Sequence, residues 1–315
     1  MTAIPLSQRL DECLVSLLDR LAVLARSRRR WRIPLLLVAG GLFFAGAYWA
    51  FSTLPISPTQ LRVTPLLILA GLILPSLVYG GIGLWLLARS AGLSMPVGRA
   101  TVISAYAYLA EMLPLPGGAV VRAAALIQAG SAPRRSSALV IFTAILWISL
   151  AMFAAGLTLL PVSARFAMPL LSIGGLVGGA IFLWLWSIAG AAIALQTLAH
   201  RIAGILLTAL RLTFAFAALH MPIGVLQAFP FVLAILLGSA SSVAPAGLGI
   251  SESLAALAAT ASDYPAGIAF LAVGIDRLFC IGGCAVLALG TEIGTSLRSA
   301  GTGGVVAQER DGNER

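Results

Sequence analysis

The sequence predicts an all-α, polytopic integral membrane protein with about seven to eight transmembrane helices and two helical hairpins broken by proline and glycine. The first observation is composition: 60% of the 315 residues are hydrophobic and only 10% are charged, whereas soluble domains carry about 25% charged residues. The second is the recurrence of apolar runs close to the ~20 residues that a membrane-spanning helix requires. The third is a pair of interruptions inside apolar regions, which hydrocarbon tolerates only where protein or water satisfies the backbone.

The basic residues mark loops rather than a nucleic-acid surface. The chain has a formal net charge of +9, and all 20 basic residues are arginines. They flank apolar runs without interleaved aromatic residues, so we interpret them as topology signals facing anionic lipid and expect no nucleic-acid partner. The three cysteines form neither a disulfide framework nor a metal-binding pattern, and we expect them to pack between helices.

The chain divides into three parts. Residues 1–32 are predicted to be a cytoplasmic, basic amphipathic segment, because leucines recur there at three- and four-residue spacing. Residues 33–295 are predicted to form the transmembrane domain, and residues 296–315 a short cytoplasmic tail. Within the transmembrane domain, full spans are expected at about 33–51, 64–88, 137–160, 169–198, 202–219, 222–242 and 266–290.

Two breaks interrupt the apolar helices, one in each half of the chain. The first separates a helix at about 97–113 from a short helix that ends near 128, and the second separates the 222–242 run from a short helix at 250–261. The residues that interrupt are Pro114, Gly117, Gly118, Pro245, Gly247 and Gly249. The arms of the first break are too short to be clear spans, so a hairpin that enters and leaves on one side fits better. Paired interruptions of this kind are typical of the binding site of a transporter.

The distribution of arginine predicts the orientation in a bacterial cytoplasmic (inner) membrane. Basic residues gather in loops on the same side as the N-terminal segment, and both termini are therefore expected in the cytoplasm. The residues expected on that side are Arg89, Arg99, Arg134, Arg135, His200, Arg201 and Arg298. Only Arg62 and Arg165 fall in the opposite loops. The two hairpins then enter from opposite faces, which is the pattern that an inverted repeat produces.

Six ionisable residues fall within the apolar regions. They are Glu111, Arg122, Arg211, Glu252, Asp276 and Arg277. A charge in mid-membrane costs about 2.5–3.5 kcal/mol on insertion scales, so these residues should be paired or line water. Since three are acidic and three are basic, mutual pairing would neutralise the set.

Arg122 is predicted to lie in the first turn of the helix that restarts after Gly118. The positive end of the helix dipole disfavours a cation there unless an anion is near. Free backbone amides and an arginine together form a site suited to phosphate or carboxylate. The alternative is that Glu111 or Glu252 supplies the anion, and both interpretations remain open.

Glu252 is predicted to lie in the first turn after Gly249, where the dipole favours a carboxylate. It is expected to cap the helix, to bind a cationic head group or to relay a proton. Asp276 and Arg277 are adjacent and point about 100° apart on a helix, so we expect them to have different partners. Arg211 lies deep in its span or extends to the interface.

No motif for catalysis, nucleotide binding or metal binding is apparent. His200 and His220 fall at opposite ends of one predicted span and cannot form a metal pair. The sequence has no metalloprotease, nucleophile-elbow or phosphate-gripping glycine motif. We therefore expect no cofactor, no metal ion and no catalytic activity.

At these residues the sequence resembles the lysylphosphatidylglycerol synthase transmembrane family, a flippase-like domain. The proline-glycine break from Leu113 to Arg122, the element from Pro245 to Glu252, and Arg277 in the last span carry the resemblance, which covers roughly residues 33–295. The resemblance implies a polytopic helical domain with two re-entrant hairpins that binds or moves polar lipids. In fused members an aminoacyl-transferase domain follows. Here only about 25 residues follow the last span, too few for a catalytic domain, so we expect a stand-alone membrane member.

The function expected from these observations is that of a flippase-like transporter of a polar phospholipid, anionic or zwitterionic. The expected substrate-binding residues are Glu111, Pro114, Gly117, Gly118, Arg122, Pro245, Gly247, Gly249, Glu252, Asp276 and Arg277. One alternative is a non-catalytic partner of a lipid- or envelope-synthesis enzyme, and another is an intramembrane head-group transferase. A homodimer and a lipid-synthesis enzyme are the protein partners that the sequence leaves open.

Overall fold

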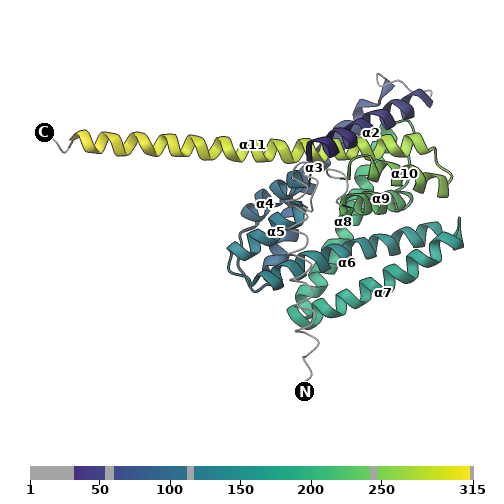
Figure 1. Cartoon of the computed structure of the whole chain (residues 1–315), viewed down its shortest axis with the longest axis horizontal. Coiled ribbons are helices and arrows are strands. Elements are labelled where there is room, and N and C mark those ends of the chain that lie inside the picture. The colour runs from purple at the N-terminus through teal and green to yellow at the C-terminus, as the bar shows by residue number, and fades with distance from the viewer. Residues whose placement is uncertain (1–31, 54–59, 112–116, 242–246, 313–315) are drawn as a thin grey trace, which may run out of the picture.

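The computed structural model describes residues 32–53, 60–111, 117–241 and 247–312. Every regular element in these residues is helical (Figure 1), which confirms the all-α class. The helices pack into a bundle, and the last helix projects beyond it toward the C-terminus (Figure 1). The N-terminal segment at 1–31, and with it Cys13, lies outside the described residues.

Five helices are long and apolar enough to cross a membrane. They are α3 (Val63–Ser90), α6 (Pro133–Leu159), α7 (Ala164–Ala189), α8 (Ala191–Ala218) and the part of α11 (Ala266–Gly312) from Ala266 to Thr291. Each of these segments has 26–28 residues, and at 1.5 Å per residue they are roughly 40 Å long, more than the ~30 Å of a hydrocarbon core. Their outer faces carry exposed apolar side chains such as Leu176 and Val286. This arrangement is typical of a multi-pass membrane protein.

A further apolar helix, α2 (Arg32–Thr53), has 22 residues and packs against α11. The ring of Phe43 on α2 stacks on Phe270 of α11 with centroids 6.2 Å apart. A Cβ at Gly46 would overlap the ring of Phe270, so the close approach of α2 and α11 depends on Gly46.

Two pairs of short helices complete the bundle. α4 (Val97–Ala110) contacts α5 (Gly117–Gln128), and α9 (Phe229–Ala240) contacts α10 (Ile250–Ala261). With 12–14 residues each, these helices are roughly 18–21 Å long, too short to cross a bilayer. The helix–break–helix arrangement expected on both sides of 112–116 and 242–246 is therefore confirmed for the flanking helices.

The full span predicted at 222–242 is wrong. Residues 221–224 are not helical, a 3₁₀ turn follows at η3 (Leu226–Ala228), and α9 begins only at Phe229. Pro230 stands in the first turn of α9, a position that proline tolerates because its missing N–H would have no partner there. The apolar run is therefore long enough for a span, but its helix is not.

The boundary between the fourth and fifth long helices is also not where the sequence predicted it. The expected spans at 169–198 and 202–219 are replaced by α7 and α8, which are separated at Gly190. Gly190 has φ +83°, a conformation that glycine adopts without steric cost. As a consequence, His200 and Arg201 lie inside α8 rather than in a cytoplasmic loop.

The two short pairs are held by different parts of the core. One cluster of buried residues joins α8, α9, α10 and α11, and its two fully buried phenylalanines, Phe216 and Phe231, have ring centroids 4.9 Å apart. A second cluster joins α3, α4, α5 and α6 around Leu84, Leu126 and Leu139. In Figure 1, α4 and α5 lie toward the end from which α11 projects, and α9 and α10 toward the other end. The two pairs therefore occupy opposite ends of the bundle.

Candidate functional site

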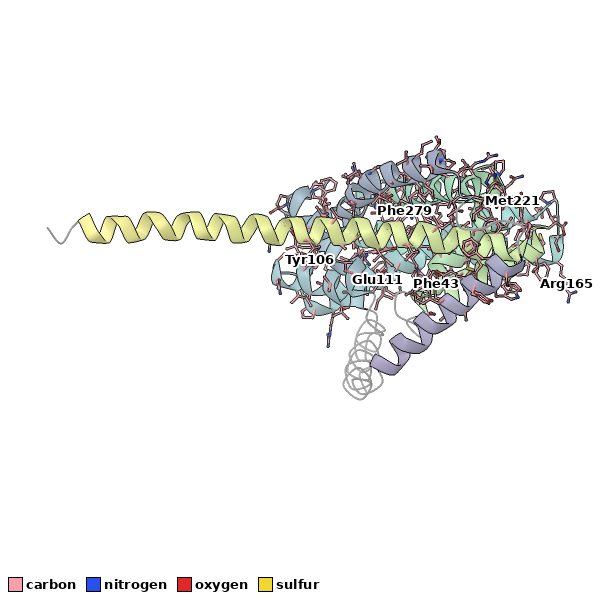
Figure 2. The ribbon with its side chains drawn as sticks, turned by 90° about the horizontal axis from the view of Figure 1, so that it is seen from above. Phe43, Tyr106, Glu111, Arg165, Met221 and Phe279 are labelled. Carbon is pink, nitrogen blue, oxygen red and sulfur yellow. The ribbon has the colours of Figure 1, made fainter. Side chains whose placement is uncertain are left out.

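All six ionisable residues predicted inside the apolar regions are paired with one another. Glu111 follows the last residue of α4, and Figure 2 shows it near the middle of the length of the bundle, between Tyr106 and Phe43. Arg122 is the sixth residue of α5 and therefore lies in its second turn, not in the first as predicted. The break is tighter than expected, because α5 already begins at Gly117.

The first ion pair joins the two arms of the α4–α5 pair. Nη1 of Arg122 donates a hydrogen bond to Oε1 of Glu111 at 3.2 Å, and the two side chains keep 31% and 26% of their surface exposed. The anion beside Arg122 is thus Glu111 rather than Glu252. A Cβ at Gly118 would overlap the Glu111 side chain. Glu111 can therefore lie against α5 only because residue 118 is a glycine. This pair is accessible to a ligand.

The second ion pair lies at the α9–α10 break. Glu252 is the third residue of α10, in its first turn as predicted, and its Oε2 accepts a hydrogen bond of 2.7 Å from the backbone N–H of Gly249. Its Oε1 accepts a hydrogen bond of 3.4 Å from Nη1 of Arg277 on α11. The Glu252 side chain has no exposed surface and that of Arg277 has 5%. Glu252 therefore caps α10 and neutralises a buried arginine at the same time.

The third ion pair joins α8 to α11. Nε and Nη2 of Arg211 donate hydrogen bonds of 2.8 and 3.0 Å to the two carboxylate oxygens of Asp276, and Nη1 donates to Oγ of Ser76 on α3 at 2.8 Å. Both charged residues are buried. The expectation that Asp276 and Arg277 have different partners is confirmed, since one contacts α8 and the other α10. Of the two placements considered for Arg211, the deep one is observed.

The glycines of the breaks allow close backbone contact. Gly247 and Gly249 have φ of +66° and +81°, and a Cβ at Gly247 would overlap the carbonyl of Gly238 in α9. Gly117 is buried, and a Cβ there would overlap the carbonyl of Ala110 in α4. Each break thus folds its second helix tightly onto its first. The predicted site residues Pro114 and Pro245 lie outside the described residues.

A second polar cluster inside the bundle was not predicted. It consists of Tyr79 on α3, Trp147 on α6, and His200 and Arg201 on α8. The rings of Tyr79 and His200 stack with centroids 4.0 Å apart, and Cζ of Arg201 lies 5.1 Å from the centroid of Trp147. We refer to these four residues as the α3–α6–α8 cluster. The sequence signal that could have found it is Arg201, which was assigned to a loop because the helix boundary was misplaced.

No model of a known protein family matches the sequence, and a search of curated proteins finds no significant match. Among the described residues, no group of three or more histidine, cysteine, aspartate and glutamate side chains is close enough to hold a metal ion. Cys280 and Cys284 are buried free thiols that pack within the bundle. The chemistry of the interior is therefore that of three neutral ion pairs and one polar cluster.

Proposed function

We propose that the chain is a lipid transporter of the flippase-like type, which binds a polar phospholipid and moves it across the bacterial cytoplasmic membrane. The proposal includes membership of, or similarity to, the lysylphosphatidylglycerol synthase transmembrane family. The observation that carries it is the presence of two broken helix pairs at opposite ends of the bundle, each with a glutamate next to its break that forms an ion pair with an arginine. Broken helices with ionisable residues at membrane depth form the substrate sites of secondary transporters.

The topology proposed for this function places both short pairs as re-entrant hairpins. If the N-terminus is cytoplasmic and α2 also crosses the membrane, α2, α3, α6, α7, α8 and α11 alternate so that α4 and α5 enter from the cytoplasm, while α9 and α10 enter from the other face. Arg89, Arg99, Arg134 and Arg135 then lie at cytoplasmic ends of helices, against Arg62 and Arg165 outside. Hairpins of opposite entry are what an inverted repeat would give, and they support access from either side in turn.

The accessible ion pair is the proposed first contact for the lipid head group. Among the described residues, Arg122 forms its ion pair with Glu111, and its side chain is 31% exposed. A phosphate group could take the place of the Glu111 carboxylate, because a guanidinium binds either anion with similar geometry. The exchange leaves Glu111 free for a cationic part of a zwitterionic head group. The buried Glu252–Arg277 pair has no such exposure and is proposed to hold the second hairpin in place.

Lipid scrambling in proteoliposomes tests this function. Vesicles carry a fluorescent phospholipid, and a membrane-impermeant reductant bleaches the outer leaflet only. Wild type is expected to bleach well beyond the half that a sealed, inactive vesicle loses. Arg122→Gln is expected to return the signal to that of protein-free vesicles, because the proposed phosphate ligand is gone.

Glu111→Gln is the informative companion variant. It frees Arg122 instead of removing it, so transport should be retained or increased if Arg122 binds the head group. If the pair is only structural, both substitutions should impair transport alike. Arg165→Gln, at an exposed position near the N-terminus of α7, serves as the control and should behave as wild type. Wild type that never exceeds protein-free vesicles with any head group would refute passive flipping and favour the role of a biosynthetic partner.

A further inference from the structure

The α3–α6–α8 cluster contains buried polar atoms that have no hydrogen-bond partner. They are the Tyr79 hydroxyl, Nε1 of Trp147, Nε2 of His200 and Nε of Arg201. The Tyr79 hydroxyl lies close enough to the Arg201 guanidinium to interact with it, but the contact does not have the geometry of a hydrogen bond. Buried polar groups are almost always hydrogen-bonded, so four such atoms in one place indicate partners that the described protein atoms do not supply.

The cluster is rich in donors and poor in acceptors. Trp147 and Arg201 offer only N–H donors, Tyr79 offers a hydroxyl donor, and the nitrogen of His200 donates or accepts according to its tautomer. No carboxylate or side-chain amide takes part in the cluster. A ligand that satisfies it must therefore present several acceptor oxygens.

The charge of the cluster points to the same kind of ligand. Arg201 forms no ion pair with a carboxylate of the described chain, in contrast to Arg122, Arg211 and Arg277. Its guanidinium instead lies over the ring of Trp147. Arg122 is near enough to add to the positive potential at Arg201. An uncompensated arginine at membrane depth is costly, and an anion would remove that cost.

The cluster lies on three helices, α3, α6 and α8, that are long and apolar enough to cross a membrane. Arg201 is the eleventh residue of α8, about 15 Å from the start of that helix. Arg89 and Arg135, by comparison, are exposed near helix ends. All four cluster side chains keep part of their surface accessible, but the four unpartnered atoms are buried, so a ligand reaches them only if the Arg201–Trp147 contact opens. The Arg201–Trp147 contact that it would open is weaker than charge-assisted hydrogen bonds to a phosphate.

Two glycines shape the cluster. A Cβ at Gly83 of α3 would lie 2.9 Å from Nε2 of His200, and a Cβ at Gly204 of α8 would overlap the Tyr79 hydroxyl. Glycine at both positions lets α3 and α8 approach closely enough to stack Tyr79 on His200. The cluster side chains of α3 and α8 are thereby brought into contact.

We propose that Arg201, Tyr79, Trp147 and His200 form an anion-binding site inside the bundle, and that its ligand carries a phosphate group. A phosphate has enough acceptor oxygens for donors that arrive from three helices. The site extends the proposed function. It rests on that function for one point only, namely that the phosphate belongs to a lipid that is transported past Arg122. A soluble phosphate has the same chemistry and is distinguished by experiment.

The test is ligand titration of the purified full-length chain in detergent micelles, followed by the thermal midpoint. The probes are phosphatidylglycerol, diacylglycerol with the same acyl chains but no phosphate, glycerol 3-phosphate and inorganic phosphate. Wild type is expected to show saturable stabilisation by phosphatidylglycerol and none by diacylglycerol. Arg201→Gln should weaken that binding about tenfold or more, as expected for loss of a charged hydrogen-bond donor. Arg201→Lys should restore part of it.

Trp147→Phe separates the donor from the ring. It keeps the aromatic surface and removes only the N–H, so binding should weaken about threefold to tenfold while the protein stays folded. Arg89→Gln is the matched control, since Arg89 also lies over a tryptophan ring, Trp85, but is exposed and donates to Gln196. It should bind as wild type does. Equal binding by Arg201→Gln and wild type, or no preference of wild type for phosphate over diacylglycerol, would overturn the site.

The two proposals fail in different ways. If Arg201→Gln loses binding but wild type does not scramble lipid, the anion site stands and transport is refuted. If wild type scrambles and Arg201→Gln binds and scrambles equally well, transport stands and the site is refuted. Binding of inorganic phosphate as tight as that of phosphatidylglycerol would support the anion site and assign it to a soluble ligand.

Discussion

Removing one partner of the Arg211–Asp276 pair should cost more stability than removing both. The pair is bidentate, its side chains are 11% and 2% exposed, and a third hydrogen bond joins Arg211 to Ser76. Asp276→Ala leaves a buried guanidinium without its anion, a change that costs about 3–5 kcal/mol in buried ion pairs. Arg211→Met leaves the carboxylate unpaired and should cost a similar amount. The double variant leaves no charge and should lose only about 1–2 kcal/mol, from the small cavity and the hydrogen bond to Ser76.

Equilibrium unfolding in mixed detergent micelles, followed by tryptophan fluorescence, measures these free energies. The double variant should be more stable than either single variant by about 2–3 kcal/mol. Arg165→Met, at an exposed site on α7, is the control and should stay within about 0.5 kcal/mol of wild type. If the two single effects simply add in the double variant, the charges do not contact each other and the packing of α8 against α11 is not as described.

The remaining predictions concern the glycines of the two breaks. Gly247→Ala should lower the free energy of unfolding by about 2 kcal/mol or more in the same titration, because φ there is +66° and the new Cβ overlaps the Gly238 carbonyl. Gly179→Ala, whose Cβ would have open space around it, should change the free energy of unfolding little. Equal effects of Gly247→Ala and Gly179→Ala would argue against the close contact of Gly247 with α9. Gly118→Ala should reduce lipid scrambling, because its Cβ would lie 2.9 Å from the Ala107 carbonyl as well as overlapping Glu111 and would force α5 away from α4. Gly98→Ala, whose Cβ meets no other atom, is the control, and full scrambling by Gly118→Ala would contradict the need for a close contact between α4 and α5.

The sequence predicted the parts of the fold that follow from composition and from strong local signals. Long apolar runs predict membrane-spanning helices, and proline beside glycine predicts a break in a helix. Charged residues inside an apolar region predict ion pairs or contact with water. The pairing of six charges with one another could be foreseen from their balance alone. The identity of each partner could not, because Arg122 had Glu111 and Glu252 as equal candidates until the helices were placed in space.

The errors came from boundaries inside continuous apolar sequence. A histidine and an arginine at 200–201 looked like a loop, whereas the chain turns at Gly190, one of 33 glycines in the sequence. Nothing local distinguishes a glycine that adopts positive φ from one that packs between helices. The run at 222–242 failed for a related reason, since hydropathy reports burial and not helix length, and α9 is buried against α8, α10 and α6 rather than spanning.

The misplaced boundary changes the charge balance of the interior and not only the outline of the fold. With His200 and Arg201 in a loop, the interior had three acids and three bases and needed nothing more. With α8 beginning at Ala191, Arg201 joins them as a seventh charged residue, and the described interior carries one positive charge without a carboxylate. Such a charge is costly at membrane depth, and an anion would lower that cost. The unpartnered donors of the α3–α6–α8 cluster mark where the compensating anion would bind, and for that reason we place the phosphate site at Arg201 rather than within the closed Glu252–Arg277 pair.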